Sequence, residues 1–220
     1  PIKLWELVRK ELGVTEIVTA YGQTETSAST TYTMPDDPLA LVSSTVGRAK
    51  SGGPAGDPDL GEDPRLGPLV TQYKTVDPIT GRDLPTGAEG ELAIRGPEVM
   101  QGYYNKPEET AAVFDQAGWM RSGDLGRIRN DGYVELTGRS KELYKCGGEL
   151  VAPKEIEELL SARKDIEQAY VVGLPDDRMG EIGCVFVIPR ADNELEPDDV
   201  IAYCREHLAR FKVTAHVMLI

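Results

Sequence analysis

The sequence predicts an α/β region followed by a smaller α+β region, and three observations support this fold class. A β-rich run near the start leads into a polar turn that contains a glycine. Short β-like runs then alternate with glycine and aspartate turns up to residue 137. Beyond residue 141, helices that begin at a proline alternate with apolar strands. We therefore expect a strand–turn element with a small β-subdomain in residues 1–137, a connection at 138–141, and a small α+β domain in 142–220.

The first elements are predicted from apolar spacing and from glycine. An amphipathic helix is expected over residues 4–12, because apolar residues at helical spacing form one stripe and Gly13 follows as a cap. The run at 14–20 is typical of a short strand. Residues 51–68 are rich in glycine, proline and aspartate and have little to bury, so we expect an irregular, mobile surface loop there.

The later helices are predicted from proline in the first turn and from apolar spacing, and the later strands from short apolar runs. The expected helices cover residues 107–114, 153–162 and 197–209, and the expected strands lie near 169–172 and 184–188. The chain starts at Pro1 without a methionine and stops at Ile220 within an apolar run. We therefore expect both domains to be truncated at the chain ends.

Composition limits the classes of binding partner and the cellular compartment that we expect for this protein. The formal net charge of −13 disfavours nucleic acid and anionic membranes, because binding to either needs a basic surface. The sequence contains neither a signal peptide pattern nor an apolar stretch long enough for an integral membrane segment. Cys146, Cys184 and Cys204 are odd in number and widely spaced, which is typical of free thiols in a reducing compartment. We expect a cytoplasmic protein.

The pentapeptide Tyr21-Gly22-Gln23-Thr24-Glu25 carries three groups that suit a nucleotide. Gly22 gives the backbone freedom to leave the strand sharply. The Tyr21 ring can lie against a planar base, the Thr24 hydroxyl can donate to a phosphate oxygen, and the Glu25 carboxylate can hold Mg²⁺. Taken alone, the pentapeptide is more simply explained as an ordinary polar turn with an N-capping threonine, so further motifs are needed.

A second group of polar residues lies around residues 119–148. Asp124 follows a glycine turn, where a carboxylate can bind both hydroxyls of a ribose or can simply stabilise the turn. Arg139, Lys141 and Lys145 concentrate positive charge within seven residues of an acidic chain, although solvated surface charge is the simpler interpretation of the lysines. The glycine pair at 147–148 fits either a hairpin or a close approach to a ligand.

Five segments in order carry a family resemblance. They are YGQTE, GELAIRGPEVMQGYYNKPEET, GWMRSGDLG, GRSKELYKCGGELVAPKEIE and VVGLPDDRMGE, and they span nearly the whole chain. This series resembles the adenylate-forming superfamily, which includes acyl- and aryl-CoA synthetases, adenylation domains of peptide synthetases and beetle luciferase. The resemblance implies the end of a large AMP-binding domain followed by a small C-terminal domain of an acyl-CoA synthetase. ATP/AMP, Mg²⁺, a carboxylic acid such as a fatty acid, and coenzyme A are the implied ligands.

The resemblance also implies roles for the residues of the first region. Tyr21, in the turn with Gly22, is expected near adenine. Thr24 is expected at the α-phosphate and Glu25 at Mg²⁺. Asp124 is expected to bind the ribose hydroxyls.

In the second region, the resemblance gives Arg139 a supporting role at the same ribose. Lys141 matches the family's hinge, about which the small domain rotates between adenylation and thioester formation. Lys145, Gly147 and Gly148 are expected to approach the pantetheine path after this rotation. Thr24, Glu25 and Lys145 are thus the expected catalytic residues.

The sequence departs from the family pattern in two respects. The family's phosphate loop precedes YGxTE and its adenylation lysine follows residue 220, so we expect residues 1–220 alone not to adenylate an acid. The segment at 51–68 is also longer than the usual turn.

Two alternatives to a CoA synthetase stay open at this stage. One is an amino-acid adenylation domain of a peptide synthetase, and the other is a non-catalytic nucleotide-binding or interaction module of the same fold. The acid that is activated and the oligomeric state are not predicted from these residues.

Overall fold

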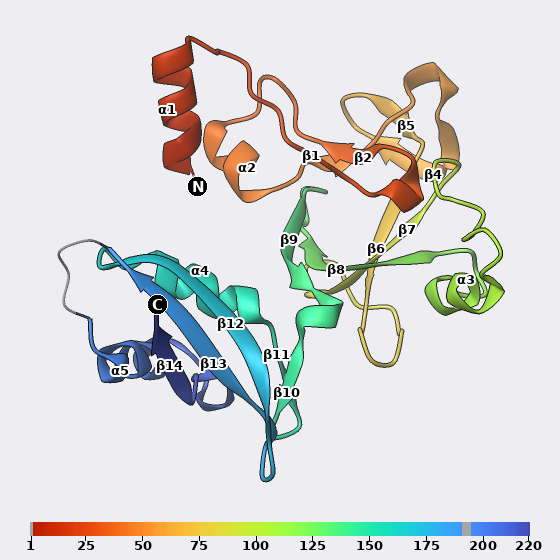
Figure 1. The fold of residues 1–220 in the computed structure, drawn as a ribbon. Coiled ribbons are helices and arrows are strands. Elements are labelled where there is room, and N and C mark those ends of the chain that lie inside the picture. Colours follow the sequence, from red (N-terminus) through yellow and green to blue (C-terminus); the bar gives the residue numbers. More distant parts are fainter. Residues whose placement is uncertain (1, 191–194) are drawn as a thin grey trace. The chain divides into compact units, whose positions relative to one another are not determined.

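The computed structural model describes residues 2–190 and 195–220, which form two compact units (Figure 1). The first unit extends to Leu136 and the second unit covers Thr137–Ile220. The expected α/β and α+β fold class is confirmed, since sheets and a few helices make up both units.

The first unit begins with a helix and a small three-stranded sheet of order β1-β2-β3. Its elements are α1 (Ile2–Leu12), β1 (Ala20–Gly22), the 3₁₀ turn η1 (Thr24–Thr26), β2 (Ser29–Tyr32), α2 (Leu39–Ser44) and β3 (Arg48–Ala49). The strand predicted over 14–20 is wrong except at its last residue. Thr19 N donates to the Thr33 hydroxyl at 2.8 Å instead of to a backbone carbonyl, so only one backbone hydrogen bond, from Thr33 N to Thr19 O at 2.9 Å, joins these two residues.

An antiparallel sheet of order β6-β7-β8-β9 forms the centre of this unit. Its elements are β6 (Gln72–Val76), β7 (Gly90–Arg95), α3 (Pro107–Val113), β8 (Met120–Ile128) and β9 (Val134–Arg139). Ile94 and Met120 are almost completely buried, and Tyr21 belongs to the same apolar cluster. This packing anchors β1, and with it the turn that follows, to the central sheet.

The prediction of an irregular loop over residues 51–68 is wrong. The segment forms the 3₁₀ turn η2 (Gly53–Ala55) and a hairpin of β4 (Asp57–Asp63) and β5 (Gly67–Leu69). The prediction counted apolar burial only, whereas polar contacts order this segment. Arg48 Nη1 lies 3.1 Å from Asp63 Oδ2, and Arg65 Nη2 lies 2.7 Å from Asp36 Oδ1.

The second unit is an α+β sandwich with strand order β11-β10-β13-β12, and β14 pairs with β13 in parallel. Its elements are η3 (Ser140–Glu142), β10 (Tyr144–Cys146), β11 (Glu149–Val151), α4 (Pro153–Ser161), β12 (Ile166–Asp176), β13 (Gly180–Pro189), α5 (Pro197–His207), η4 (Arg210–Lys212) and β14 (His216–Leu219). The predicted helices and strands of this region all lie within one or two residues of, or inside, these elements.

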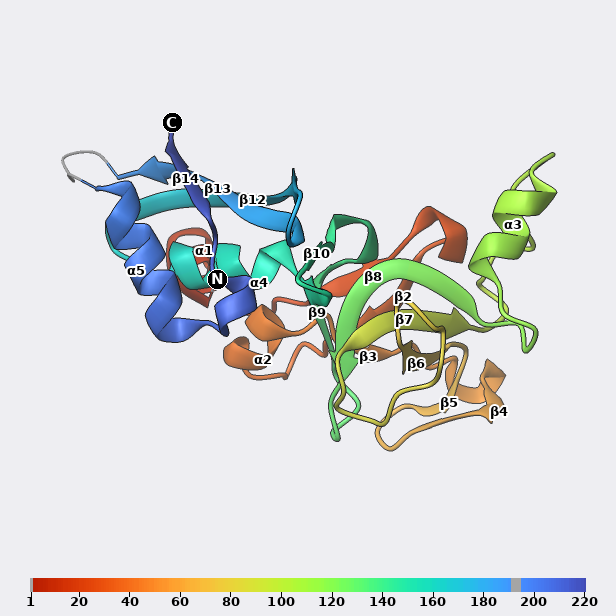
Figure 2. The ribbon, with the colours of Figure 1, turned by 90° about the horizontal axis from the view of Figure 1, so that it is seen from below.

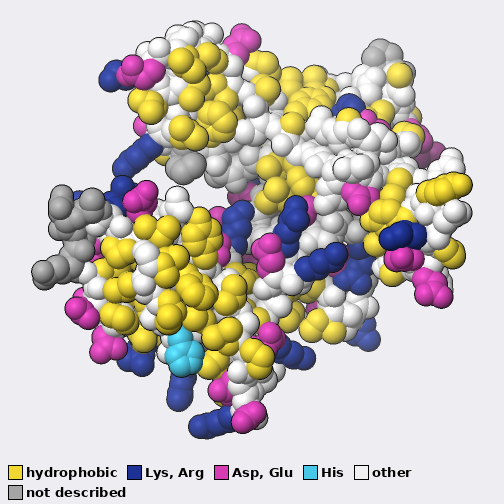
Figure 3. Space-filling view, in the orientation of Figure 1, with side chains coloured by type: hydrophobic (Ala, Val, Ile, Leu, Met, Phe, Trp, Pro, Cys, Tyr) yellow, Lys and Arg dark blue, Asp and Glu magenta, His cyan; other side chains and the backbone are white. Residues whose placement is uncertain are grey.

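Both helices of the second unit cover the same face of its sheet (Figure 2). Ile156 and Leu160 of α4 and Val200 and Cys204 of α5 have no exposed surface, which explains the apolar spacing of both helices. Apolar side chains also gather over β12–β14 on the surface that Figure 3 shows, where the exposed residues are Tyr170, Val172, Leu174 and Met218. In the described residues, helices therefore cover only one face of this sheet.

The three cysteines are free, as predicted, and the structure shows that all three are buried. Within the described ranges, no helix has the length and apolar character needed to cross a bilayer.

Candidate functional site

The turn after β1 is fixed by its own polar groups. Gln23 is extended (φ −134°, ψ 165°) and precedes η1. Its backbone N–H donates to Thr26 Oγ1 at 3.0 Å, and the Thr26 N–H donates to Gln23 O at 3.1 Å. Thr26 is completely buried. These two hydrogen bonds fix the backbone conformation of the turn.

Gly22 is needed here because of a close backbone approach. A Cβ atom at this position would lie 2.1 Å from the carbonyl oxygen of Ala28. Its φ is not in the left-handed region, so steric space, rather than a conformation that only glycine adopts, explains the residue. The register of β1 on β2 shifts between Tyr21 and Gly22, which turns the chain toward η1.

Tyr21, Gln23 and Asp124 form a hydrogen-bonded cluster between β1, η1 and β8. The Tyr21 hydroxyl and the Gln23 amide both donate to Asp124 Oδ2 at 2.7 Å. Tyr21 is 9% and Asp124 7% exposed. Burial, and then the hydrogen bond to the Asp124 carboxylate, raises the pKa of Tyr21 well above its usual range. The phenol therefore stays protonated and remains a donor.

Glu25 is held by the segment between β7 and α3. The Tyr103 hydroxyl donates to Glu25 Oε1 at 2.9 Å, and Met100 N donates to Glu25 O at 2.7 Å. The hydrogen bond to the carboxylate raises the pKa of Tyr103. Glu25 is half-buried, whereas Thr24 is exposed. The turn thus presents a hydroxyl and an oriented carboxylate side by side.

The charged residues predicted in the second unit lie at its start. Arg139 ends β9, Lys141 lies in η3 and Lys145 lies at the centre of β10. All three are exposed. The Lys145 backbone N–H donates to Glu181 Oε2 at 2.8 Å, so β10 is fixed while the ammonium faces solvent.

Gly147 and Gly148 form the two-residue turn of the β10–β11 hairpin, in which Cys146 pairs with Glu149. Their φ angles are +61° and +94°. Two consecutive positive φ angles favour glycine at both positions. A Cβ on Gly147 would also lie 2.7 Å from Met179 Cε. The hairpin requirement alone accounts for both glycines.

The structure joins Tyr21 and Asp124 directly and places Thr24 and Glu25 on the same turn. Sequence reasoning gave no role to Gln23 or to Tyr103, although both lie inside the motifs. Their partners are 101 and 78 positions away in the chain. Only an expectation of which strands are neighbours could have found them.

In the part of the chain that the structure describes, no group of three or more His, Cys, Asp or Glu side chains could hold a metal ion. Glu25 therefore belongs to no such group among the described residues. Mg²⁺ commonly binds through one or two carboxylates together with water and substrate phosphates. A single carboxylate beside an expected phosphate position fits that pattern.

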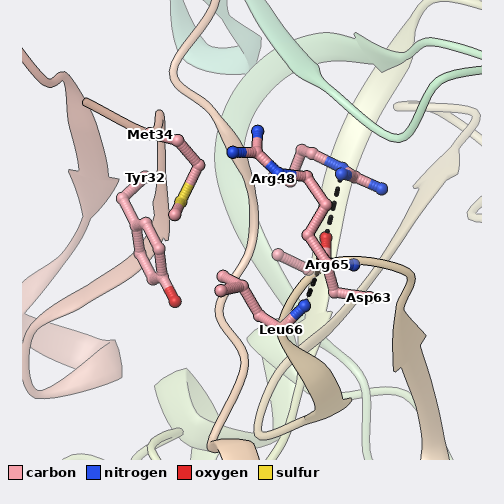
Figure 4. Close-up of a pocket in the computed structure, with 7 residues that line it drawn as sticks. Tyr32, Met34, Arg48, Asp63, Arg65 and Leu66 are labelled. Atoms are coloured by element: carbon pink, nitrogen blue, oxygen red, sulfur yellow. Dashed lines mark hydrogen bonds and ion pairs between the residues drawn. The ribbon is translucent and has the colours of Figure 1, made fainter. Parts of the chain in front are cut away.

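A small pocket of the first unit lies elsewhere (Figure 4). It is lined by Tyr32, Met34, Arg48, Ala49, Asp63, Arg65 and Leu66. Its enclosed space of about 10 Å³ suits a single water molecule. Figure 4 shows the ion pair of Arg48 with Asp63 at its wall. It contains none of the predicted site residues and is too small for a nucleotide.

Comparison with known proteins places this architecture among enzymes that bind AMP. Residues 1–104 match the family model described as AMP-binding enzyme, and residues 155–220 match the model of the AMP-binding enzyme C-terminal domain. The chain therefore belongs to the AMP-binding enzyme family.

Relatives in this family are CoA ligases. The chain is 36% identical over 220 residues to the 3-[(3aS,4S,7aS)-7a-methyl-1,5-dioxo-octahydro-1H-inden-4-yl]propanoyl:CoA ligase of Rhodococcus jostii (strain RHA1), with 100% of the chain and 37% of the relative covered. It is 35% identical to the medium-chain fatty-acid–CoA ligase of Escherichia coli (strain K12), with 93% of the chain and 33% of the relative covered. The chain spans about a third of the length of these relatives.

The fold is also similar to that of a solved enzyme with its nucleotide. ATP-bound MatB from Rhodopseudomonas palustris matches with a TM-score of 0.78 and 30% identity, over 93% of this chain and 36% of that chain. The two units therefore correspond to a part of an adenylate-forming enzyme.

Proposed function

We propose that the protein containing this chain is an AMP-forming acid–thiol ligase, which activates a carboxylic acid with ATP and transfers the acyl group to coenzyme A. The observation that carries this proposal is the buried Asp124 carboxylate, which two donors hold at one oxygen. The relatives' names support a CoA ligase. Attack of the acid on ATP releases pyrophosphate and gives an acyl-adenylate, and a thiol then displaces AMP.

In the first unit, we assign Asp124 to the ribose hydroxyls and Tyr21 to the adenine end of the site, with Gly22 keeping the turn compact. Thr24 contacts the α-phosphate, and its exposure on the turn supports this role. Glu25 holds Mg²⁺, which supplies charge neutralisation at the phosphates. Tyr103 keeps the Glu25 carboxylate oriented for this task.

In the second unit, we assign the steps that follow adenylation. Residues 1–137 are then the end of the large domain, 138–141 the hinge region and 142–220 the small domain. Lys141 is the hinge residue and Arg139 supports the ribose. Lys145, Gly147 and Gly148 act near the pantetheine arm. The exposure of Lys141 and Lys145 supports roles toward ligands rather than within the core.

A substrate panel on the full-length protein tests the proposal. Fatty acids of medium length come first, because the Escherichia coli relative is a medium-chain fatty-acid–CoA ligase. We expect release of pyrophosphate and AMP that depends on the acid, and an acyl-CoA product when coenzyme A is present. A matched Glu25→Gln variant, which keeps the acceptor for Tyr103 but loses the charge, should lose most of this activity. Unchanged turnover in that variant would show that the Glu25 charge is not needed, whereas a wild-type protein that releases no pyrophosphate with any acid would favour a non-catalytic module instead.

The 220-residue chain tested alone should show no ATP–pyrophosphate exchange, since it spans little more than a third of its relatives. Measurable exchange by this chain alone would refute that expectation.

We further propose a cytoplasmic location. The three cysteines are buried and free, and this usage suits a reducing compartment.

A further inference from the structure

Gln23 makes contacts that the roles proposed above do not use. Its amide Nε2 donates to Ser122 O at 2.9 Å and to Asp124 Oδ2 at 2.7 Å. A primary amide has two hydrogens, so both are directed at the same short segment of β8. The side chain ties the turn after β1 to the strand that carries Asp124.

The backbone on both sides of this contact is fixed. On the first side, the Gln23 N–H bonds to the buried Thr26 hydroxyl. On the other side, Gly123 has a φ of +77°, and its N–H donates to Glu91 Oε1 at 3.0 Å. The Arg121 Nε holds the same Glu91 carboxylate at 2.8 Å. The Gln23 amide therefore links two rigid segments.

The link acts on the orientation of one carboxylate. Asp124 Oδ2 receives the Tyr21 hydroxyl from one side and the Gln23 amide from the other. A single donor leaves a carboxylate free to rotate about its Cβ–Cγ bond, whereas two donors from different segments define its plane. Hydrogen bonds to charged acceptors are also the stronger ones.

We propose that Gln23 is a positioning residue for nucleotide recognition, which together with Tyr21 fixes the plane of the Asp124 carboxylate for the ribose hydroxyls. This inference rests on the proposed function, in which Asp124 binds the ribose. Gln23 thereby contributes to the selection of ribonucleotides over deoxyribonucleotides without touching the nucleotide.

The test compares KM values of the full-length enzyme for ATP, 2′-deoxy-ATP and 3′-deoxy-ATP. Gln23→Met has a similar length and removes both donors. We expect its preference for ATP over the deoxy analogues to fall about tenfold, equal to about 1.4 kcal/mol. The kcat at saturating ATP and the KM for the acid should stay near the wild-type values. Gln23→Glu keeps the shape but sets a second carboxylate against Asp124, so its preference should fall further.

Gln72→Met is the matched control. Gln72 lies on β6 and its Oε1 accepts a hydrogen bond from Arg95 at 2.7 Å, so this variant also loses a side-chain contact but not one to Asp124. Its nucleotide preference should equal that of the wild type. An equal loss of preference in Gln72→Met and Gln23→Met would overturn the proposal. Lower thermal stability of Gln23→Met with an unchanged preference would also overturn it, because the role would then be structural only.

Asp124→Ala distinguishes a failure of the proposed ribose site from a failure of the positioning role of Gln23. If this variant keeps the preference for ATP, the ribose role of Asp124 is wrong and the proposed assignment of the site fails. If Asp124→Ala loses the preference while Gln23→Met keeps it, only the positioning role of Gln23 fails.

Discussion

The predicted site residues of the two units differ in how the protein holds them. Tyr21 and Asp124 are nearly buried and bonded to each other. Lys141 and Lys145 are exposed on short elements. The difference indicates that the groups proposed for nucleotide recognition are oriented before a ligand arrives, whereas the side chains of the two lysines are exposed to solvent. Preorganised groups lose less free energy when the ligand binds. Substitutions in the first set should therefore lower both stability and activity, and those in the second set activity alone.

Asp124→Ala should have the largest effect. It removes the acceptor of the Tyr21 hydroxyl and the Gln23 amide, and each donor left unsatisfied in a buried site costs about 1–3 kcal/mol. We expect a lower unfolding midpoint in urea and a loss of about 10²–10³ in kcat/KM for ATP in the full-length enzyme. Pyrophosphate release and equilibrium unfolding measure the two effects.

Asp59→Ala is its control, since Asp59 is exposed on β4 and distant in sequence from the cluster. Asp59→Ala should change neither the unfolding midpoint nor kcat/KM for ATP. If Asp124→Ala lowered activity without lowering stability, the contrast between the two units would disappear.

Lys145→Ala should lower activity without lowering stability. The backbone N–H that bonds Glu181 is kept in this variant, so the unfolding midpoint should not change. If the ammonium assists thioester formation, the rate of acyl-CoA formation should fall about hundredfold while ATP–pyrophosphate exchange stays near the wild-type rate. Lys164→Ala, a change at another exposed lysine of the second unit, is the control. Equal loss of both half-reactions would assign Lys145 to adenylation instead.

The helices and the fold class could be predicted because their signals are local. Proline at the start and apolar spacing placed a helix at 153–162, and the structure has one at Pro153–Ser161. Similarly, a glycine pair between two apolar runs suits the hairpin found at Gly147 and Gly148.

What the sequence did not predict depends on contacts between distant positions. The β4–β5 hairpin was missed because Arg65 reaches Asp36, 29 positions earlier, and such ion pairs leave no periodic pattern. Gln23 was missed for the same reason, since its side chain contacts Asp124 only because the fold brings β8 beside the turn. Motif order gave the residues that we propose to face the ligand, and the fold was needed to find those that hold them.

A pH dependence of stability tests the buried polar contacts of the first unit. The Tyr133 hydroxyl donates to Asp37 Oδ1 at 2.8 Å. Burial, followed by this carboxylate, raises the pKa of Tyr133 from 10.0 to about 12. The folded state thus favours the protonated phenol, so the stability that this hydrogen bond contributes is complete below pH 10 and is lost as the pH rises toward 12.

Urea midpoints measured between pH 9 and 11 should fall for the wild type and should fall less for Tyr133→Phe. Tyr170→Phe, at an exposed tyrosine of the second unit, should follow the wild type. A slope in Tyr133→Phe equal to that of the wild type would contradict this assignment.

Arg65→Ala should have the smallest effect. Arg65 pairs with the exposed Asp36 at 2.7 Å and with the buried Asp37 at 3.3 Å, and its own side chain is 40% exposed. Solvent screens most of the exposed pair, so we expect only a small loss in the free energy of unfolding. ATP–pyrophosphate exchange by the full-length enzyme should not change, because the hairpin contains no predicted site residue. Arg82→Ala, at an exposed arginine of the same unit, gives the baseline. A clear loss of exchange in Arg65→Ala alone would show that the β4–β5 hairpin affects the proposed nucleotide site. The residues that orient this site would then include the hairpin as well as the Asp124 cluster.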